Sequence, residues 1–118
     1  MIFIIDDDEM FADCIKSAIK KHNKNIEIKT FTNALDAMNC LDDLPDLIFL
    51  DILLPGPDGF TFLNELASYS DTAKIPIILV TSLQLPETDL SIYGVRAILN
   101  KEKMKPEEVI AYVKRFTN

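Results

Sequence analysis

Tryptophan is absent from this sequence of 118 residues, and histidine, cysteine and glycine are scarce, with one, two and three copies. The two cysteines, Cys14 and Cys40, are too few to staple a small fold with disulfides. The single histidine, His22, offers no imidazole cluster that would join them in a zinc site. Both cysteines lie among apolar neighbours, so we expect buried free thiols and a reducing, cytoplasmic setting.

Positive charge and long apolar runs are also scarce. The chain has 12 basic and 19 acidic residues, and its formal net charge is -7. A protein this acidic repels phosphate backbones, so we expect no direct nucleic-acid partner and favour cations or basic protein surfaces. No apolar run approaches the roughly 20 residues that span a bilayer. The short segment before the first aspartate has no basic start, so we expect neither a membrane segment nor a secretion signal.

The residues that are present suffice for an ordinary core. Hydrophobic residues make up 48% of the chain and charged residues 26%, and both fractions are usual in globular proteins. The length fits one compact domain, and no internal repeat, low-complexity tract or linker interrupts it. We therefore expect residues 1–118 to form a single domain.

Short apolar runs alternate with stretches of helical periodicity. The apolar or alternating runs predict strands at residues 1–5, 26–31, 47–50, 75–80 and 97–99. Helices are expected at residues 10–22, after a cap at Asn33, at 60–69 and from Pro106, with an ambiguous segment at 85–93. Runs that are apolar on every side predict a parallel sheet with helices on both faces. The predicted fold class is α/β, a doubly wound (βα)5 domain.

Two of the predicted helices have a clear inward face. The helix capped by Asn33 is expected to bury a side that comprises Ala34, Ala37, Met38, Leu41 and Leu44. The helix at residues 60–69 is expected to bury Phe60, Leu63, Leu66 and Ala67.

Polar side chains follow most of the predicted strands. Asp6, Asp7 and Asp8 follow the first strand, Asp51 the third, Thr81 and Ser82 the fourth, and Asn100 and Lys101 the fifth. In open α/β sheets, ligands bind beyond the carboxyl ends of the strands. We therefore expect acids, a hydroxyl and an amine from distant parts of the chain to meet at one edge of the sheet.

A divalent cation would explain why several carboxylates gather at this edge. Two or three oxygen ligands with space left for water suit Mg²⁺ better than Ca²⁺. The lack of thiol or imidazole ligands argues against zinc. We expect Asp7 and Asp51 to hold the ion and Asp6 to act through water.

The same residues fit phosphoryl chemistry. An aspartate beside Mg²⁺ can act as a nucleophile toward a phosphoryl group. The transfer itself needs mainly positioning and charge neutralisation. Asp51, Thr81 and Lys101 supply a nucleophile, a hydroxyl and an ammonium group for that purpose.

Along nearly its whole length the chain resembles the receiver domain of two-component response regulators. The matching segments are "IIDDDE", "DLIFLDILLPGPDGF" around Asp51, "IPIILVTS" with Thr81, and "GVRAILNKE" with Lys101. Each segment alone is a weak signal, but all four in order are specific. The resemblance implies a flavodoxin-like fold with strand order 2-1-3-4-5. It also implies a phosphorylated signalling module that is not an enzyme and that has no output domain within residues 1–118.

The resemblance further implies a role for each matching residue. Asp51 would accept a phosphoryl group from a histidine kinase or a phosphotransfer protein, and the domain would then act on a downstream protein target. Mg²⁺ would be held by Asp6, Asp7, Asp51 and the main-chain carbonyl of Leu53. Thr81 would move to bind the phosphoryl group and Lys101 would pair with it, while homodimerisation is left open.

The sequence departs from the receiver pattern in three places. Ile98 stands where receivers usually carry an aromatic residue, so the usual coupling of that ring to Thr81 is in question. Glu102 replaces a proline after Lys101, and a cis bond to a non-proline residue costs about 3 kcal/mol, so we expect a trans bond and a shifted loop. The stretch from Thr81 to Lys101 is a residue or two shorter than is usual in receivers. Together with Pro86, this predicts a shortened or irregular fourth helix.

Two leucines bear on the lifetime of the phosphorylated state. Leu53 and Leu83 each lie two positions after an expected site residue and are expected to flank the phosphoryl group. Neither apolar side chain can orient an attacking water, so we predict slow loss of the group, and Leu53→Asn should speed it.

Two other functions remain open from the sequence. The first is a binding module of receiver fold that no longer uses phosphorylation, for which Ile98 and Glu102 are the motive. The second is a haloacid-dehalogenase-like phosphatase with Asp6 as nucleophile and Asp8 as acid/base. Met10 weakens that second hypothesis, because the phosphatase family expects a threonine soon after the aspartates.

Overall fold

The computed structural model describes residues 1–56, 58–82 and 90–117. The strands are β1 (Ile2–Ile5), β2 (Ile28–Phe31), β3 (Leu47–Leu50), β4 (Ile77–Thr81) and β5 (Val95–Asn100). The helices are α1 (Glu9–His22), α2 (Ala34–Met38), α3 (Gly59–Ala67) and α4 (Pro106–Phe116), with 3-10 turns η1 (Leu41–Asp43) and η2 (Ser91–Tyr93). None of these helices is long and apolar enough to cross a bilayer.

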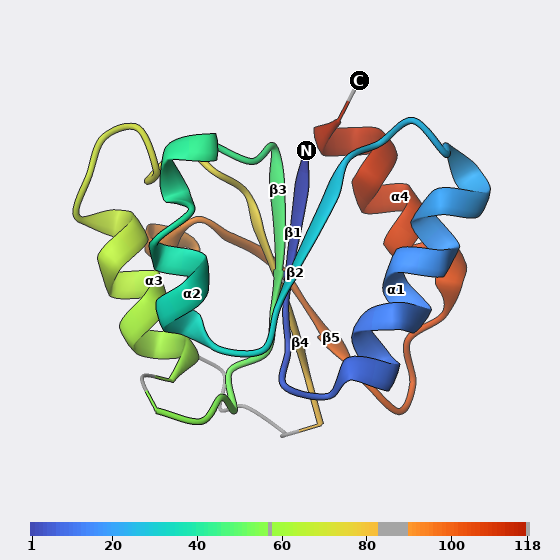
Figure 1. Cartoon of the computed structure of the whole chain (residues 1–118), viewed down its shortest axis with the longest axis horizontal. Helices are drawn as coiled ribbons and strands as arrows, with labels where there is room; N and C mark the ends of the chain where they lie inside the picture. The colour runs from blue at the N-terminus through green and yellow to red at the C-terminus, as the bar shows by residue number, and fades with distance from the viewer. Residues whose placement is uncertain (57, 83–89, 118) are drawn as a thin grey trace.

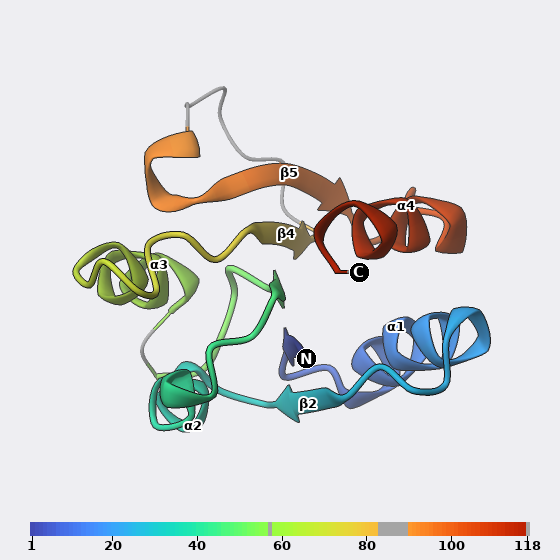
Figure 2. The ribbon, with the colours of Figure 1, turned by 90° about the horizontal axis from the view of Figure 1, so that it is seen from above.

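The strands form one parallel sheet in the order β2-β1-β3-β4-β5, which confirms the predicted fold class and strand order. Helices α2 and α3 cover one face and α1 and α4 the other, so the sheet is doubly wound (Figure 1). Figure 2 shows β2 and β5 as the two edge strands. Strands β1, β2 and β3 end side by side, because Ile5, the last residue of β1, pairs with Phe31 and Leu50, the last residues of β2 and β3. Residues that follow these strands therefore lie along one edge, here called the carboxyl edge.

Alternation along each strand divides the core into two parts. In β1, Phe3 and Ile5 pack with the α2–α3 side, whereas Ile2 and Ile4 pack with the α1–α4 side. All four residues are fully buried. The continuous apolar runs read from the sequence therefore correspond to strands covered on both faces.

Side chains at the helix starts satisfy backbone N–H groups that have no partner within the helix. Asp8, Asn33 and Asp58 cap α1, α2 and α3 by accepting from backbone N–H groups three residues further on. Pro106 begins α4, where its fixed φ fits the first helical position. The predictions for Asn33 and Pro106 are confirmed.

The predicted inward faces of two helices need correction. Helix α2 ends at Met38, and Leu44 is half-exposed with a left-handed φ of 48°. Pro45 follows Leu44 and disfavours a helical conformation there. In α3, Phe60 and Ala67 are exposed.

Helix α3 differs from the prediction in its start and in its buried face. The helix begins one residue earlier than predicted, at Gly59. Its buried stripe is Gly59, Phe62, Leu63 and Leu66, which follows the i, i+3, i+4, i+7 spacing of one helix face. The prediction of Leu63 and Leu66 as buried residues is confirmed.

Both cysteines are free thiols, as expected, but they are not buried. Cys14 is exposed because the buried stripe of α1 is Ala12, Ile15 and Ile19, and position 14 lies outside it. Cys40 is partly buried and follows the end of α2.

Much of the predicted fourth helix lies outside the described residues, and this includes Leu83 and Pro86. The described end of this segment is the single 3-10 turn η2. Gly94 ends that turn with φ 83° and donates its N–H to the Ser91 carbonyl.

Candidate functional site

The site is built on the ends of β1 and β3, which lie side by side. Asp6 directly follows β1 and Asp51 directly follows β3, and the pairing of Ile5 with Leu50 makes them neighbours. The backbone N–H of Asp51 donates to the Ile5 carbonyl at 2.9 Å, so the ladder continues into the site. Both side chains are buried, since Asp6 is 1% exposed and Asp51 5%. Two carboxyl groups therefore occupy adjacent positions inside the protein.

A third carboxylate joins them at the surface. One oxygen from each of Asp6, Asp7 and Asp51 lies within 4.8 Å of the other two. Asp7 is exposed, so the cluster opens toward solvent on its side. Among the described residues these three form the acidic cluster that could hold a metal ion.

Lys101 brings a positive charge into this cluster. Its Nζ lies 2.7 Å from Asp6 Oδ2 and 3.0 Å from Asp51 Oδ2. The Lys101 backbone N–H donates to the Thr81 carbonyl at 3.0 Å, which holds the end of β5 against β4. The bond from Lys101 to Glu102 is trans, as expected. With this trans bond the Lys101 ammonium still lies beside the two aspartates.

The contacts of Lys101 with its two acids differ in geometry. The ammonium donates a hydrogen bond to Asp51 Oδ2. Asp6 Oδ2 lies closer to the ammonium, yet this buried atom has no hydrogen bond of good geometry within the described part of the chain. It therefore keeps capacity for a further ligand.

Asp51 also accepts a hydrogen bond from the loop that follows it. The Leu53 backbone N–H donates to Asp51 Oδ1 at 3.1 Å, and the Leu53 side chain is half-exposed. Gly59 lets the start of α3 approach this loop, because a Cβ atom there would lie 2.7 Å from Ile52 Cα and 2.9 Å from the Asp51 carbonyl oxygen.

Burial and charge act against each other at this site. Burial raises the pKa of the Asp6 carboxyl above its ordinary value, and the nearby Lys101 ammonium offsets only part of that rise. Burial alone would lower the pKa of Lys101, but its contacts with Asp6 and Asp51 outweigh burial and raise it. The lysine is therefore held as a cation.

Other residues that follow the strands have different positions. Thr81 is fully buried at the end of β4, and Ser82 is exposed. Asn100 Oδ1 accepts the Glu102 N–H at 2.8 Å and stabilises the turn after β5. Asp8 accepts the Phe11 N–H as the α1 cap, so its carboxylate serves the helix and is not placed as an acid/base group beside Asp6.

Ile98 and Phe11 complete the surroundings of the site. Ile98 lies on edge strand β5 and is partly exposed. The centroid of the Phe11 ring lies 4.6 Å from Lys101 Nζ. The sequence did not single out Phe11, because this contact joins the first helix to the residue that follows the last strand.

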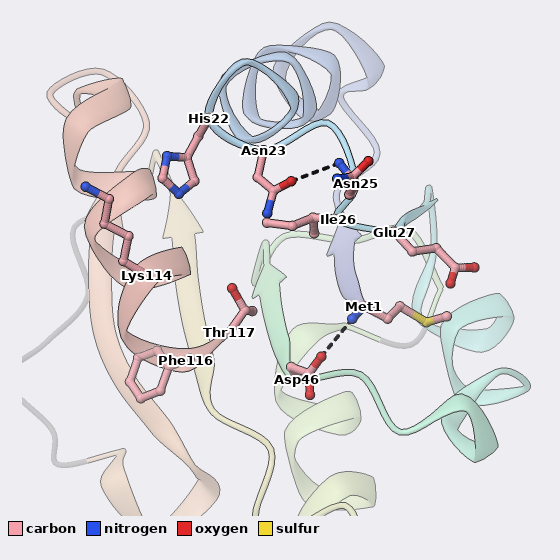
Figure 3. A pocket seen from close by; sticks show the side chains of 10 residues that line it. All are labelled: Met1, His22, Asn23, Asn25, Ile26, Glu27, Asp46, Lys114, Phe116 and Thr117. Atoms are coloured by element: carbon pink, nitrogen blue, oxygen red, sulfur yellow. Dashed lines mark hydrogen bonds and ion pairs between the residues drawn. The ribbon is translucent and has the colours of Figure 1, made fainter.

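A pocket at the opposite edge of the sheet contains none of the predicted site residues (Figure 3). The Met1 ammonium forms a 2.7 Å ion pair with Asp46 there, and Asn23 Oδ1 accepts the Asn25 N–H. His22 and Lys114 lie on the other side of this pocket (Figure 3). We call this edge of the sheet, where the strands begin, the amino edge.

A doubly wound α/β domain with acids and a lysine at the carboxyl ends of its strands defines the class of protein. The family model of the response regulator receiver domain matches residues 2–114. The chain belongs to the response regulator receiver domain family, a family of two-component signalling modules.

Relatives of known role support this membership. The chain is 31% identical over 121 residues to the sensor histidine kinase CheAY of Helicobacter pylori, an alignment that covers 98% of the chain and 15% of that protein. It is 33% identical over 117 residues to the regulatory protein VanR of Enterococcus faecium, covering 96% of the chain and 48% of VanR. The chain therefore spans less than half the length of these relatives.

Solved structures agree in fold. The signal receiver domain of a DNA-binding response regulator from Colwellia psychrerythraea superposes with a TM-score of 0.83 and 26% identity, covering 99% of this chain and 98% of that one. The signal receiver domain of a histidine kinase from Syntrophus aciditrophicus gives a TM-score of 0.80 and 27% identity, with coverage of 98% and 87%.

Proposed function

We propose that Asp51 is the phosphoacceptor and takes a phosphoryl group from a phosphohistidine. The observation that carries this proposal is the buried Asp51 carboxylate, whose Oδ2 lies 3.0 Å from the Lys101 ammonium beside two further aspartates. In the transfer, a carboxylate oxygen forms a bond to phosphorus while the phosphorus–nitrogen bond to the donor imidazole breaks. The electron pair of that bond returns to the imidazole nitrogen, which takes up a proton.

Lys101 and Thr81 would each bind an oxygen of the transferred group. Lys101 supplies a fixed positive charge at the position where negative charge accumulates, which is the main demand of phosphoryl transfer. Thr81 is the hydroxyl residue at the end of the neighbouring strand. Ile98 replaces the usual aromatic partner of this threonine, so movement of Thr81 would not be coupled to a ring flip.

The acidic cluster would hold Mg²⁺ through Asp6, Asp7, Asp51 and the Leu53 main-chain carbonyl. Support comes from the oxygen-only donor set and from the buried Asp6 Oδ2, which lacks a hydrogen bond of good geometry. When bound, Mg²⁺ would neutralise charge on the carboxylates and on the phosphoryl oxygens.

Several further properties belong to this proposal. The phosphoryl donor would be a histidine kinase or a phosphotransfer protein, and the output would be a changed surface for a downstream protein. Residues 1–118 would act as one receiver domain that is a signalling module, not a turnover enzyme, and a cytoplasmic location stays a prediction. Leu53 and Leu83 would slow loss of the phosphoryl group, although Leu83 lies outside the described residues.

Intact-mass measurement tests the proposal directly. The chain is incubated with acetyl phosphate and Mg²⁺, and one phosphoryl group should be added. Asp51→Asn should abolish the mass gain, whereas Asp71→Asn, a control at an exposed acid outside the site, should leave it unchanged. No mass gain in the parent chain would favour the phosphorylation-independent binding module instead.

The same proteins separate the remaining alternative. A phosphatase of the haloacid-dehalogenase type would turn over a phosphate ester, lose that activity in Asp6→Asn and keep it in Asp51→Asn. We expect no such turnover, because the Asp8 carboxylate is engaged as a helix cap.

A further inference from the structure

Phe11 and Lys101 belong to a closed cycle of contacts at the carboxyl edge. Asp6 Oδ1 accepts the Asp8 N–H at 2.9 Å, and Asp8 Oδ1 accepts the Phe11 N–H at 3.2 Å. The Phe11 ring centroid lies 4.6 Å from Lys101 Nζ, which in turn lies 2.7 Å from Asp6 Oδ2. The start of α1 is therefore linked to the acidic cluster twice, through the backbone and side chain of Asp8 and through the Phe11 ring. These links place the ring beside the ammonium.

The ring contact is attractive for physical reasons. The face of an aromatic ring carries negative charge density and attracts an ammonium group within about 6 Å of its centroid. Lys101 also lines a small pocket with Phe11 of α1, Met104 of the segment between β5 and α4, and Val109 of α4. The Lys101 side chain is only 14% exposed, so salt screens the attraction less than it would at an open surface.

We propose that Phe11 is a positioning residue for Lys101, and that its ring sets how strongly the lysine competes with a divalent cation for Asp6 and Asp51. The inference rests on the proposed function in one respect, that the acidic cluster binds Mg²⁺. It explains why the third consecutive aspartate is useful, since Asp8 fixes the helix turn that carries Phe11.

The competition follows from shared residues. The ammonium contacts Asp6 Oδ2 and Asp51 Oδ2, and these two residues are also members of the metal-binding cluster. A cation held by both residues would compete with the ammonium for their carboxylate charge and repel it, and this would also draw the ammonium away from the ring. Removing the ring weakens the hold on the lysine, so the cation should bind more tightly. The loosely held lysine should at the same time support phosphoryl transfer less well.

The expected changes in cation binding and in phosphoryl transfer have opposite signs. This distinguishes loss of a positioning contact from general damage to the site. A variant that only disturbs the site would weaken both cation binding and phosphoryl transfer. Loss of the Phe11–Lys101 contact should strengthen the first and weaken the second.

A double-mutant cycle on Mg²⁺ affinity tests the inference. Calorimetric titration with MgCl₂ is made on the parent chain, Phe11→Leu, Lys101→Met and the double variant. Phe11→Leu should lower the Kd for Mg²⁺ about two- to five-fold in the parent background, the size expected of a partly buried cation–π contact. In the Lys101→Met background the same change should have no effect. An equal effect in both backgrounds, no effect in either, or weaker binding would overturn the inference.

Matched variants guard against indirect effects. Phe11→Tyr keeps a ring face and should restore the parent Kd. Phe116→Leu removes a ring contacted by Arg96 and Arg115 in a different part of the protein, and it should leave the Kd unchanged. If Phe11→Leu does not fold, Phe11→Met provides an unbranched apolar replacement for the same cycle.

A second readout needs no metal. The ring current of Phe11 should shift the ε-methylene protons of Lys101 in the NMR spectrum of the metal-free protein, and Phe11→Leu should remove that shift. Absence of the shift in the parent would overturn the contact itself. These results are independent of the phosphoacceptor role, because a parent chain without mass gain at Asp51 would refute that role while leaving the cycle measurable.

Discussion

The two edges of the sheet carry ion pairs of the same length but of very different character. At the carboxyl edge, Lys101 lies 2.7 Å from Asp6, with side-chain exposures of 14% and 0%. At the amino edge, the Met1 ammonium lies 2.7 Å from Asp46, with exposures of 18% and 57%. Distance alone would rank the two pairs as equals. Burial separates them, and the buried pair also lies beside the carboxylates of Asp7 and Asp51.

The difference has an energetic meaning. Removing charges from water costs several kcal/mol per ion, and the mutual attraction offsets this cost only when the geometry is favourable. An exposed pair bears little of that cost and gives little stability. A buried ion pair is therefore weak evidence for a gain in stability, and its position among acids fits the phosphoryl-transfer role proposed for the carboxyl edge.

The largest expected difference between the edges is in the rate of phosphoryl gain. Lys101→Met removes the ammonium that would meet the phosphoryl oxygens, and the rate should fall about 100-fold, as when one charge-stabilising donor is removed from an active site. Lys114→Met at the amino edge should leave the rate unchanged. The rates are measured by intact mass over time with acetyl phosphate and Mg²⁺. Equal rates in the two variants would remove the distinction between the edges.

Two glycine variants compare the edges of the sheet by their effect on the free energy of unfolding. Gly59→Ala forces a Cβ against Ile52 Cα and the Asp51 carbonyl, both backbone atoms, and should lower the free energy of unfolding by about 2–3 kcal/mol. Gly94→Ala, at the amino-terminal end of β5, places a side chain at a left-handed φ and should cost about 1–2 kcal/mol.

The two glycine variants should differ in Mg²⁺ affinity as well. Gly59→Ala displaces the loop that holds Asp51, so it should weaken Mg²⁺ binding, whereas Gly94→Ala should not. Urea unfolding and calorimetric titration measure the two quantities. A loss of affinity in both variants would show that global stability, and not the edge, controls the site.

Sequence patterns predicted the parallel sheet well, because buried parallel strands leave continuous apolar runs that few other structures need, whereas the strand order came from the family resemblance. Residues 47–50 were placed with the observed bounds. The patterns also predicted that Asp51 and Lys101 follow strands of the same sheet, and the structure brings them within hydrogen-bond distance.

The sequence patterns missed two kinds of feature. One is which face of a helix is buried, and the other is contact between distant elements. In α3 the buried ring is Phe62 and not the predicted Phe60, because packing selects a different face of the helix. The contact between Phe11 and Lys101 joins the first helix to the last strand, and no local pattern encodes it. The roles of the site residues stay predictions until phosphorylation and metal binding are measured.

The pH dependence of stability provides a smaller test of the carboxyl edge. The folded state raises the pKa of Asp6 above its ordinary value of 3.8, so the folded protein binds this proton more tightly than the unfolded chain does. Stability from this group is therefore present at low pH and is lost as pH rises from the unfolded value through the raised folded value.

The variant Asp6→Asn should remove this contribution. In metal-free buffer, the slope of unfolding free energy against pH just above pH 3.8 should become more positive than in the parent chain. Urea unfolding at a series of pH values measures the slope. An unchanged slope would mean that Asp6 titrates alike in the folded and unfolded states.

The smallest effect is expected for the exposed ion pair at the amino edge. Asp46→Asn removes the partner of the Met1 ammonium, and it should lower the unfolding free energy by only about 0–1 kcal/mol, because water solvates both groups once they separate. Added salt should reduce even this difference, since exposed charges are screened. Urea unfolding at low and high salt gives the comparison. A loss of several kcal/mol would mean that the amino edge holds a coupled charge network, and the contrast between the two edges would then rest on their chemistry alone.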